Sequence, residues 1–587
     1  MTEALWEDRL ERRDYLILAT FCLILFGLSL FGGRPLSIHE SVLPQSSRSM
    51  LADGDYVVPK KGDAPWLESP PFPQWATVSI ASVIGRCDEV WIVRSGPTLA
   101  AMATVLLIAW MASAWFGRQI GLLSGYVFAT TCQFTRYAWL AEDEIFLCMI
   151  VTASLALFTK IELSFKSSSR EVPQPFFGNR NWLMLAFFVV LGMTNLCKGL
   201  AFGTAMAVIP IAGFLLWNAD KQQITRYFWF WGWLAFLGIA ISWPLAALVR
   251  YPDVVDLWRY DLQGRLTEGY IGEPIWYYAQ NLPWILAPWT LVIPFGFWVT
   301  RYEALAERYS PQRFLWCWAL LVPAVFSLPD GKHHHYMLHA IAPWSILASF
   351  GLLFVREKMM EWPRAMRHPA ISLLTVATPG IATLWMLRDR LPGPEWLPIV
   401  GCIALPIVAM TLTWLLLNKS LLVAGRGLFV ATAMFYAIGH VMAGQYFDIS
   451  RHDANFLTEV NSLVDSDDSL LVDMSVSDLR GFHCLFYLRD DVETLHNLSF
   501  LRDERIEEKT VYVLTRFSHE STLNEFGKCE VVLRSEETGR EKSIGDRMTL
   551  FRLNYNDDVK RISSANVRIS PMQSMYRSEG PFLGKRL

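Results

Sequence analysis

The sequence predicts an all-α polytopic membrane protein, with about thirteen transmembrane helices, that ends in a small α/β domain. Three observations indicate this fold class. The 587 residues are 53% hydrophobic and 18% charged, whereas soluble proteins carry about 25% charged residues. Apolar stretches of about 18 residues or more, long enough to cross a bilayer, recur over residues 1–447. After about residue 445 the composition becomes charged and short alternating segments begin. An ordinary soluble enzyme is therefore excluded.

The first apolar run, residues 15–31, follows a basic opening with Arg9, Arg12 and Arg13. A signal peptide shares these features. The run is long for a signal peptide, however, and residues 31–34 (Phe-Gly-Gly-Arg) make a poor cleavage site, so we interpret it as the first transmembrane helix. Residues 74–86 are apolar but short and predict an interfacial helix. Further spans are predicted at 91–116, 119–138, 145–163, 182–197, 200–217, 228–249, 281–299, 314–329, 336–354, 370–387, 397–417 and 428–447.

The distribution of lysine and arginine predicts a cytoplasmic N-terminus. With that orientation, the short cytoplasmic loops collect most of the basic residues, as the positive-inside rule requires. These residues are Lys160, Lys166, Arg170, Arg180, Lys221, Arg226, Arg301, Arg308, Arg313, Arg356, Lys358, Arg364 and Arg367. An odd number of spans places the first loop, 33–73, and the C-terminal region on the extracytoplasmic side. We expect a multi-pass protein of the plasma (inner) membrane.

Residues 448–555 predict the extracytoplasmic α/β domain, with strands at 469–474, 510–515 and 548–553 and an amphipathic helix near 456–464. Residues 556–587 predict a flexible tail. A disulfide between Cys484 and Cys529 is left open. The net charge of −3 and the lack of a basic surface exclude nucleic acid as a partner.

Charged residues at the outer ends of the spans are the candidates for chemistry, because charge at membrane level is costly. Carboxylates and cations that converge there would suit a phosphate-bearing substrate and a general base. The alternative is that these loops are simply solvated. The candidates are His39, Glu40, Arg48, Asp55 and Glu68 in the first loop; Glu142, Asp143 and Glu144 in an acidic turn; and Lys198, Asp261, Arg265, Lys332, His333, His334, His335, Tyr336 and His339 in later loops.

The first loop resembles that of the protein O-mannosyltransferase and lipid A aminoarabinose transferase family. The shared pattern is an acidic pair followed by Arg-x-Met-Leu-x-x-Gly-Asp-x-x-x-Pro, which here spans Arg48 to Pro59 after Glu40. Leu67-Glu-Ser-Pro-Pro with Gln74-Trp75 resembles a second element of the family. The acidic turn, Lys198-Gly199, Trp276-Tyr-Tyr before Leu282-Pro-Trp, and Lys332 to Tyr336 agree as well. The sequence departs from the family at three positions: His39 replaces the catalytic Asp, Val42 an Arg, and Ser69 a Lys.

The resemblance implies a GT-C transmembrane domain over residues 1–447, with 33–73 as its catalytic loop. It also implies a glycosyltransferase that moves a pentose or hexose from a polyprenyl-phosphate donor to a lipid, glycan or protein acceptor, in one inverting step on the outer face. Catalytic roles are expected for Glu40, His39, Asp143 and Glu144. Phosphate binding is expected for Lys198, Arg265, Lys332 and Tyr336, and substrate contacts for Arg48, Asp55, Glu68 and Asp261.

Glu40, ionised near neutrality, is expected to be indispensable, with His39 as the alternative base. Members of the family bind a divalent ion near the residue matched by Glu68, and His335 and His339, four apart, would share a helix face. A divalent metal is therefore left open, and no other cofactor is implied. Two rival functions remain. The His39 substitution suits a catalytically inactive binding subunit, and the many spans suit a lipid or sugar transporter, although no inverted repeat of broken helices is evident.

Overall fold

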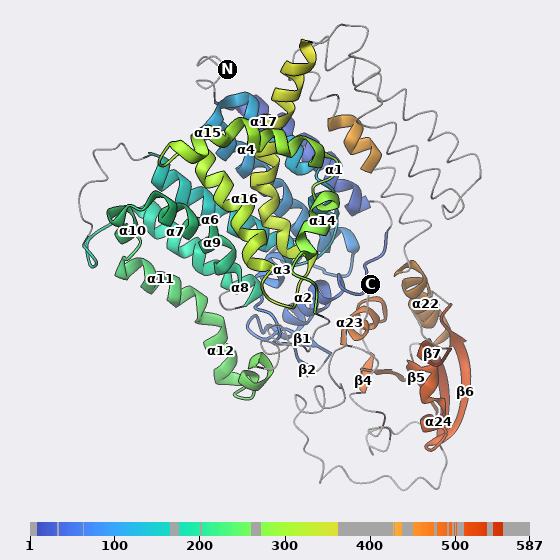
Figure 1. Ribbon diagram of the computed structural model, residues 1–587. Coiled ribbons are helices and arrows are strands. Elements are labelled where there is room, and N and C mark those ends of the chain that lie inside the picture. Colours follow the sequence, from blue (N-terminus) through green and yellow to red (C-terminus); the bar gives the residue numbers. More distant parts are fainter. Residues whose placement is uncertain are drawn as a thin grey trace.

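The computed structural model describes residues 9–31, 34–62, 64–164, 175–199, 202–259, 272–361, 427, 429–436, 450–465, 467–474, 478–489, 492–495, 498, 501, 510–536 and 544–555. Helices pack together over the first two thirds of the chain, and a small sheet lies beside them (Figure 1). The first loop, with α2, β1 and β2, lies between the two parts.

The helical part begins with α1 (Arg12–Phe31), α2 (Val42–Asp53) and α3 (Phe72–Ile84). It continues through α4 (Val90–Ala129), α5 (Cys132–Ala138), α6 (Glu144–Ser164), α7 (Trp182–Met193), α8 (Asn195–Lys198), α9 (Phe202–Asn218), α10 (Lys221–Arg226), α11 (Phe230–Ala240) and α12 (Ser242–Arg250). The later helices are α14 (Tyr277–Ile285), η3 (Trp289–Val292), α15 (Ile293–Ala306), α16 (Pro311–Phe326), η4 (His334–Ala340) and α17 (Ile341–Met360).

Five helices among the described residues are long and apolar enough to cross a membrane, or six if the bent pair α14 and η3–α15 is one span. Two shorter apolar helices cover 182–198 and 202–218. The spans predicted at 370–387 and 397–417, and most of 428–447, lie outside the described residues. The multi-pass character is thereby supported, while the number of thirteen stays a prediction.

One predicted span differs in shape from the structure, and one predicted break between two spans is present. The span expected at 281–299 is broken, because α14 and the η3–α15 segment meet at 106°, where Pro288 cannot donate a backbone hydrogen bond. α4 is interrupted at Gly117, whose φ of 81° and ψ of 173° are not helical. Glycine tolerates this φ without steric cost. The break falls between the spans predicted at 91–116 and 119–138.

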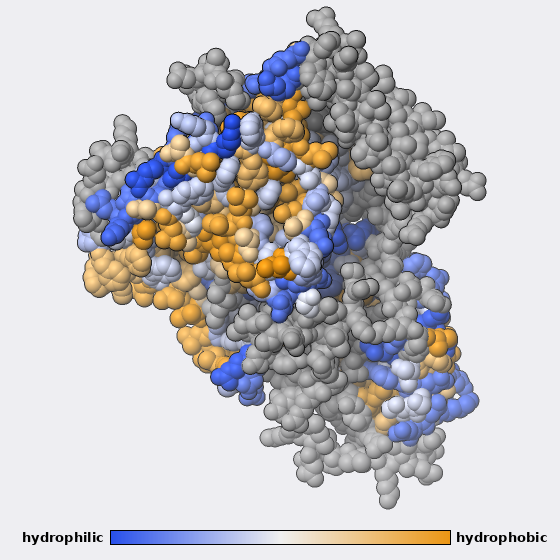
Figure 2. All heavy atoms as spheres, viewed as in Figure 1, coloured by the Kyte–Doolittle hydropathy of each residue, from blue (hydrophilic) through white to orange (hydrophobic). Residues whose placement is uncertain are grey.

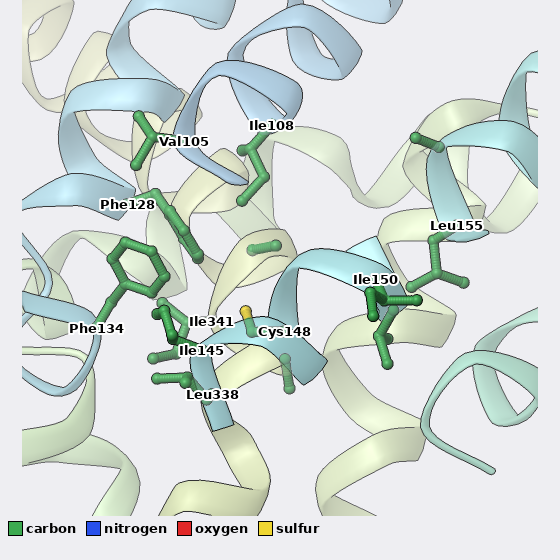
Figure 3. Packing of buried hydrophobic residues seen from close by; sticks show 14 of the residues in the cluster. Val105, Ile108, Phe128, Phe134, Ile145, Cys148, Ile150, Leu155, Leu338 and Ile341 are labelled. Atoms are coloured by element: carbon green, nitrogen blue, oxygen red, sulfur yellow. The ribbon is translucent and has the colours of Figure 1, made fainter. Parts of the chain in front are cut away.

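The core of the helical part is formed mainly by α4, α5, α6, η4 and α17. Figure 3 shows Val105 and Ile108 of α4 together with Ile145 and Cys148 of α6 and Leu338 of η4. Apolar residues are also exposed on the outside, and Figure 2 shows hydrophobic residues gathered over α11 and α12. The exposed residues there are Trp231, Trp233, Leu234, Leu237, Ile241, Leu245, Leu248 and Val249. A face of this kind is expected to contact lipid.

The C-terminal sheet has five strands in the order β4-β3-β5-β7-β6. They are β3 (Leu470–Asp473), β4 (Glu493–Leu495), β5 (Thr510–Arg516), β6 (Gly527–Arg534) and β7 (Met548–Tyr555). β3 is parallel to β4 and β5, and β7 is antiparallel to β5 and β6. Helices α22 (Ser450–Leu463), α23 (Asp478–Tyr487), η8 (Phe517–His519), α24 (Glu520–Leu523) and η9 (Ile544–Asp546) complete the region. The predicted strands are present as β3, β5 and β7, while Cys484 and Cys529 are free.

Helix α23 packs against the first loop. Arg48 donates a hydrogen bond to the Leu485 carbonyl, and the Phe482 ring lies 4.9 Å from the Trp66 ring. The loop also contains the short hairpin of β1 (Lys60–Lys61) and β2 (Ala64–Pro65). Lys61 Nζ lies 5.7 Å from the centre of the Phe482 ring. The first loop and α23 must therefore lie on the same side of the membrane.

The topology is testable by cysteine labelling. Glu68, Lys221 and Glu525 are all exposed. A membrane-impermeant maleimide added to intact cells should label Glu68→Cys and Glu525→Cys, and should label Lys221→Cys only after permeabilisation, because we predict that Lys221 is cytoplasmic. The unchanged chain gives the background. Labelling of Lys221→Cys but not of Glu68→Cys in intact cells would show that the orientation is reversed.

Candidate active site

Lys198 lies between two carboxylates at the start of α6. Its Nζ donates to Asp143 Oδ2 at 3.0 Å and to Glu144 Oε1 at 2.7 Å. Their side chains are 15%, 28% and 8% exposed, respectively. Lys198 is the last residue of α8. The two acidic residues lie at the N-terminal end of α6, where the helix dipole favours negative charge. The sequence predicted these groups separately, and the fold brings them into one cluster.

A pocket opens beside this cluster, between α6, α8, α9 and η4. Its lining residues are Glu144, Leu147, Cys148, Lys198, Phe202, Met206, His335, Tyr336, Leu338 and His339. Lys198 and Glu144 both line it, and His335 Nε2 lies 3.5 Å from Glu144 Oε1. Apolar residues such as Leu147 and Met206 contribute as well, and the Tyr336 and Phe202 rings are 4.7 Å apart. Such a pocket suits a ligand with an anionic group and an apolar portion.

The carboxylates of the acidic turn perturb one another. Burial, and then the charge of Glu144, raise the pKa of Asp143 to about 6, against a lowering by Lys198. Burial raises the pKa of Glu142 well above its ordinary value, and the charges of Glu144 and Glu40 add to this rise. Glu142 therefore holds its proton to a higher pH than an ordinary carboxyl group. Asp143 can exchange a proton near neutrality, as a general base must.

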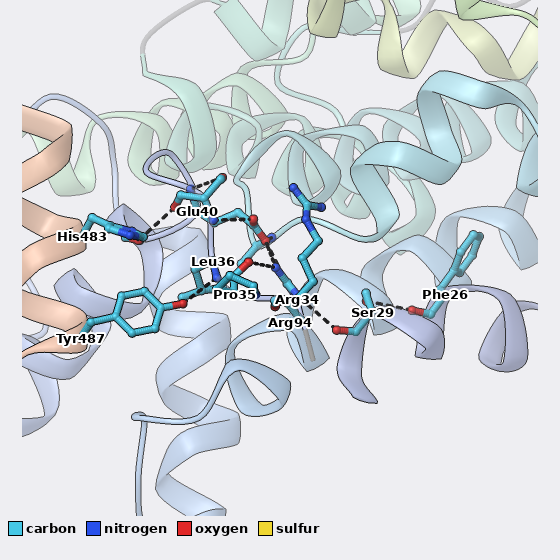
Figure 4. A network of polar contacts seen from close by, with 12 residues as sticks. Phe26, Ser29, Arg34, Pro35, Leu36, Glu40, Arg94, His483 and Tyr487 are labelled. Carbon is cyan, nitrogen blue, oxygen red and sulfur yellow. Dashed lines mark hydrogen bonds and ion pairs between the residues drawn. The ribbon is translucent and has the colours of Figure 1, made fainter. Parts of the chain in front are cut away.

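Glu40 is completely buried, and Figure 4 shows it in a polar network with Arg94. Its Oε1 accepts from Arg94 Nε at 2.9 Å and from the Ala141 amide at 3.1 Å, while Oε2 accepts from the Ser37 amide at 2.9 Å. Burial acts to raise the pKa of Glu40, but the charges of Arg94 and Arg34 and these hydrogen bonds outweigh burial and hold it below its ordinary value. The pocket lining does not include Glu40.

The remaining first-loop candidates lie away from the pocket lining. His39 and Glu68 are exposed. Arg48 faces α23, with its guanidinium 5.9 Å from the centre of the Phe486 ring. Asp55 forms an ion pair with Arg250 at 2.6 Å and accepts from the amides of residues 57 and 58.

Of the other predicted phosphate-binding residues, Tyr336 lines the pocket and interacts electrostatically with Lys198. Lys332 is 5% exposed, and its Nζ donates to the Glu273 carbonyl at 2.6 Å. Asp261 and Arg265 lie outside the described residues. Among the described members of this set, Lys198 and Tyr336 line the pocket.

The suggested metal ligands do not gather. His335 and His339 belong to η4 and both line the pocket. Within the described ranges, no group of three or more His, Cys, Asp or Glu side chains is arranged to hold a metal ion. The described residues therefore do not provide a ligand set that fits a divalent ion.

Arg94 is the residue that our sequence analysis missed. It lies in α4 and is 1% exposed. Arginine near the start of a predicted span, at 91–116, is itself a signal, because a buried guanidinium needs a partner. The contacts of His483 and Tyr487 with the first loop could not be predicted in this way, since they join segments more than four hundred residues apart.

The fold has clear relatives among solved structures. ArnT from Cupriavidus metallidurans bound to undecaprenyl phosphate aligns with a TM-score of 0.71 and 18% identity, over 92% of this chain and 97% of that chain. The apo form of the same protein aligns with a TM-score of 0.70. These alignments establish an ArnT-like GT-C fold for the chain, as the sequence predicted.

The sequence comparisons are more specific. Residues 63–258 match the dolichyl-phosphate-mannose-protein mannosyltransferase family. An undecaprenyl phosphate-alpha-4-amino-4-deoxy-L-arabinose arabinosyl transferase from Shewanella sediminis is 24% identical over 496 residues, which cover 81% of this chain and 84% of that protein. The resemblance to the protein O-mannosyltransferase and aminoarabinose transferase family is confirmed. The chain is thus similar to transferases whose names carry a polyprenyl-phosphate donor.

Proposed function

We propose that this glycosyltransferase uses an undecaprenyl-phosphate-linked pentose or hexose as its donor and acts at the pocket between α6, α9 and η4. The observation that carries the proposal is Lys198, which is held by Asp143 and Glu144 and lines a pocket that also has apolar residues in its lining. The relatives named above act on an undecaprenyl phosphate aminoarabinose, which supports this donor class. The acceptor would be a lipid, glycan or protein on the outer face of the plasma membrane.

Lys198 would bind the donor phosphate. An ammonium has three N–H donors, and two of them serve Asp143 and Glu144. The third is available for a phosphate oxygen in the pocket. Tyr336, which also lines the pocket, would contact the same group. Phe202, Met206 and Leu147 would contact apolar parts of the donor.

The transfer would be a single displacement. An oxygen of the acceptor attacks the anomeric carbon as the bond between that carbon and the phosphate oxygen breaks, and the phosphate leaves with the bonding electrons. Lys198 stabilises the charge that develops on the phosphate. Asp143 contacts Lys198 but is not itself among the residues that line the pocket. With its pKa raised to about 6, it takes the proton from an acceptor oxygen that reaches the acidic turn. Inversion at the anomeric carbon follows from one displacement.

Removing the cation should weaken phosphate binding. We expect Lys198→Met to weaken the binding of undecaprenyl phosphate to the purified protein by about 1.5–3 kcal/mol, or roughly 10- to 150-fold, because a hydrogen bond to a charged group contributes on this scale. The matched comparison is Lys332→Met. The Lys332 ammonium is held by the Glu273 carbonyl, and the expected loss is smaller. Equal affinity of the Lys198→Met and unchanged proteins would remove Lys198 from the phosphate site.

The proton acceptor should be visible in the pH dependence. Because Asp143 acts as a base only when it is ionised, kcat/KM should fall as the pH falls through about 6. Lys198 lowers this pKa, so Lys198→Met should move the acidic limb to higher pH. Asp143→Asn should lower turnover by about 10²–10⁴-fold.

The control for this experiment is Asp253→Asn at an exposed position. This variant should retain the turnover of the unchanged protein and the acidic limb of its pH profile. A fully active Asp143→Asn protein with an unchanged pH profile would exclude Asp143 as the base.

A further inference from the structure

We propose that Glu40 and Arg94 form a positioning pair that fixes the backbone of the acidic turn, and that α23 holds the segment carrying Glu40 in place. The inference rests on the proposed function in one respect, because it takes the acidic turn to carry the reacting carboxylate. It assigns Glu40 a role that does not require contact with substrate.

Arg94 joins three parts of the chain. Its Nη1 donates to the Ser29 carbonyl at 3.1 Å and to the Arg34 carbonyl at 3.0 Å, and its Nη2 donates to the Pro35 carbonyl at 3.1 Å. Its Nε binds Glu40. A guanidinium has five N–H donors, so these contacts occupy most of them. Arg94 therefore ties α4 to the end of α1 and to the first loop, and has little capacity left for a ligand.

Glu40 transmits this constraint to the acidic turn. Its Oε1 receives the Ala141 amide, two residues before Asp143. The start of the turn is held by a second contact, from Trp139 Nε1 to the Leu25 carbonyl of α1 at 2.8 Å. The backbone that leads to Asp143 is thus fixed from two sides. Displacing a reacting group by about 1 Å can cost about 10²-fold in rate, so this constraint bears directly on turnover.

Helix α23 holds the first loop on both sides of Glu40 (Figure 4). On one side, the Leu36 amide donates to the Tyr487 hydroxyl at 2.7 Å. On the other, Ser41 Oγ and His483 Nδ1 are 2.8 Å apart. Both partners come from one helix and lie one turn apart. The C-terminal region therefore contributes directly to the placement of Glu40.

A second ion pair provides a matched control. Asp14 and Arg118 join α1 to α4, with contacts of 2.7 and 3.0 Å, and Asp14 is 1% exposed. This pair touches neither the first loop nor the acidic turn in the contacts above. Its loss should destabilise the protein without moving Asp143.

Amide hydrogen exchange tests the placement without requiring activity. Glu40→Ala and Arg94→Met should each speed exchange of the amides in 139–143 by about tenfold or more, the loss expected for a hydrogen bond to a charged group. Tyr487→Phe should speed exchange in 34–41 to a smaller extent. Asp14→Asn should leave both segments unchanged. Equal protection of 139–143 in all variants, or equal loss of protection in Asp14→Asn, would overturn the proposal.

The pH profile separates a positioning carboxylate from a base. If Glu40 positions the turn, Glu40→Gln and Arg94→Met should each lower kcat by about 10–10²-fold, with the donor KM and the acidic limb retained. The double variant should be no worse than the worse single variant, because the two side chains act as one unit. Loss of the limb in Glu40→Gln would instead make Glu40 the base and overturn the proposal.

If the proposed function is wrong, the unchanged protein will not transfer the sugar. This outcome differs from a failure of the positioning role, which changes the variants and not the unchanged protein. The exchange measurement would still decide the positioning role.

Discussion

The arrangement of the first loop depends on one buried ion pair, that of Arg94 and Glu40. Their side chains are 1% and 0% exposed. A buried charge without a partner is expensive, and removing one member of a buried pair typically costs about 3–5 kcal/mol. Each group therefore requires the other. Arg94 also donates to the carbonyl of Ser29 at the end of α1 and to that of Arg34 at the beginning of the first loop, and buried carbonyls require such donors. One side chain thus sets where the loop leaves the helical part.

This constraint explains why the residues matched to the family motif build the loop and do not line the pocket. Gly54 ends α2 in the left-handed conformation, with φ of 68°, and its amide bonds to the Met50 carbonyl. This conformation favours glycine. Asp55 then caps the next turn and pairs with Arg250 of α12. Arg48 reaches the backbone of α23. The motif therefore specifies a shape that carries Glu40 to the acidic turn.

The extent to which the sequence predicts this structure follows from the range of the interactions involved. Apolar runs reflect local composition, and the helices α1, α6, α9, α16 and α17 fall where spans were predicted. The break between α14 and η3 was missed, because Pro288 interrupts the helix without lowering its hydrophobicity. The strands β3, β5 and β7 were predicted from alternation, whereas β4 has three residues and β6 exposes much of its length. Short or exposed strands carry a weak pattern.

The candidate site shows the same limit. Asp143, Glu144 and Lys198 were chosen because charges at the ends of apolar spans need an explanation, and the structure joins them. The role of Glu40 could not be predicted. The sequence shows that Glu40 is charged, but it does not show that Arg94 forms an ion pair with this carboxylate. His39 illustrates the reverse case. It occupies the position of the family's catalytic Asp, yet its side chain is exposed, and the pocket lining comes from other segments. Sequence identifies which groups are chemically able, and packing decides which of them can reach a substrate.

The balance of charge around the turn suggests why two distinct cations are needed. Four carboxyl groups, Glu40, Glu142, Asp143 and Glu144, lie close enough to influence one another's protonation. If all were ionised beside an apolar pocket, their repulsion would oppose the binding of a phosphate. Arg94 pairs with Glu40, and the raised pKa of Glu142 favours the protonated form of that carboxyl group. Lys198 and Glu144 line the pocket, and Asp143, outside that lining, contacts Lys198. The buried pair therefore balances the charge of a carboxylate that acts on Glu142, in addition to fixing the backbone that leads to Asp143.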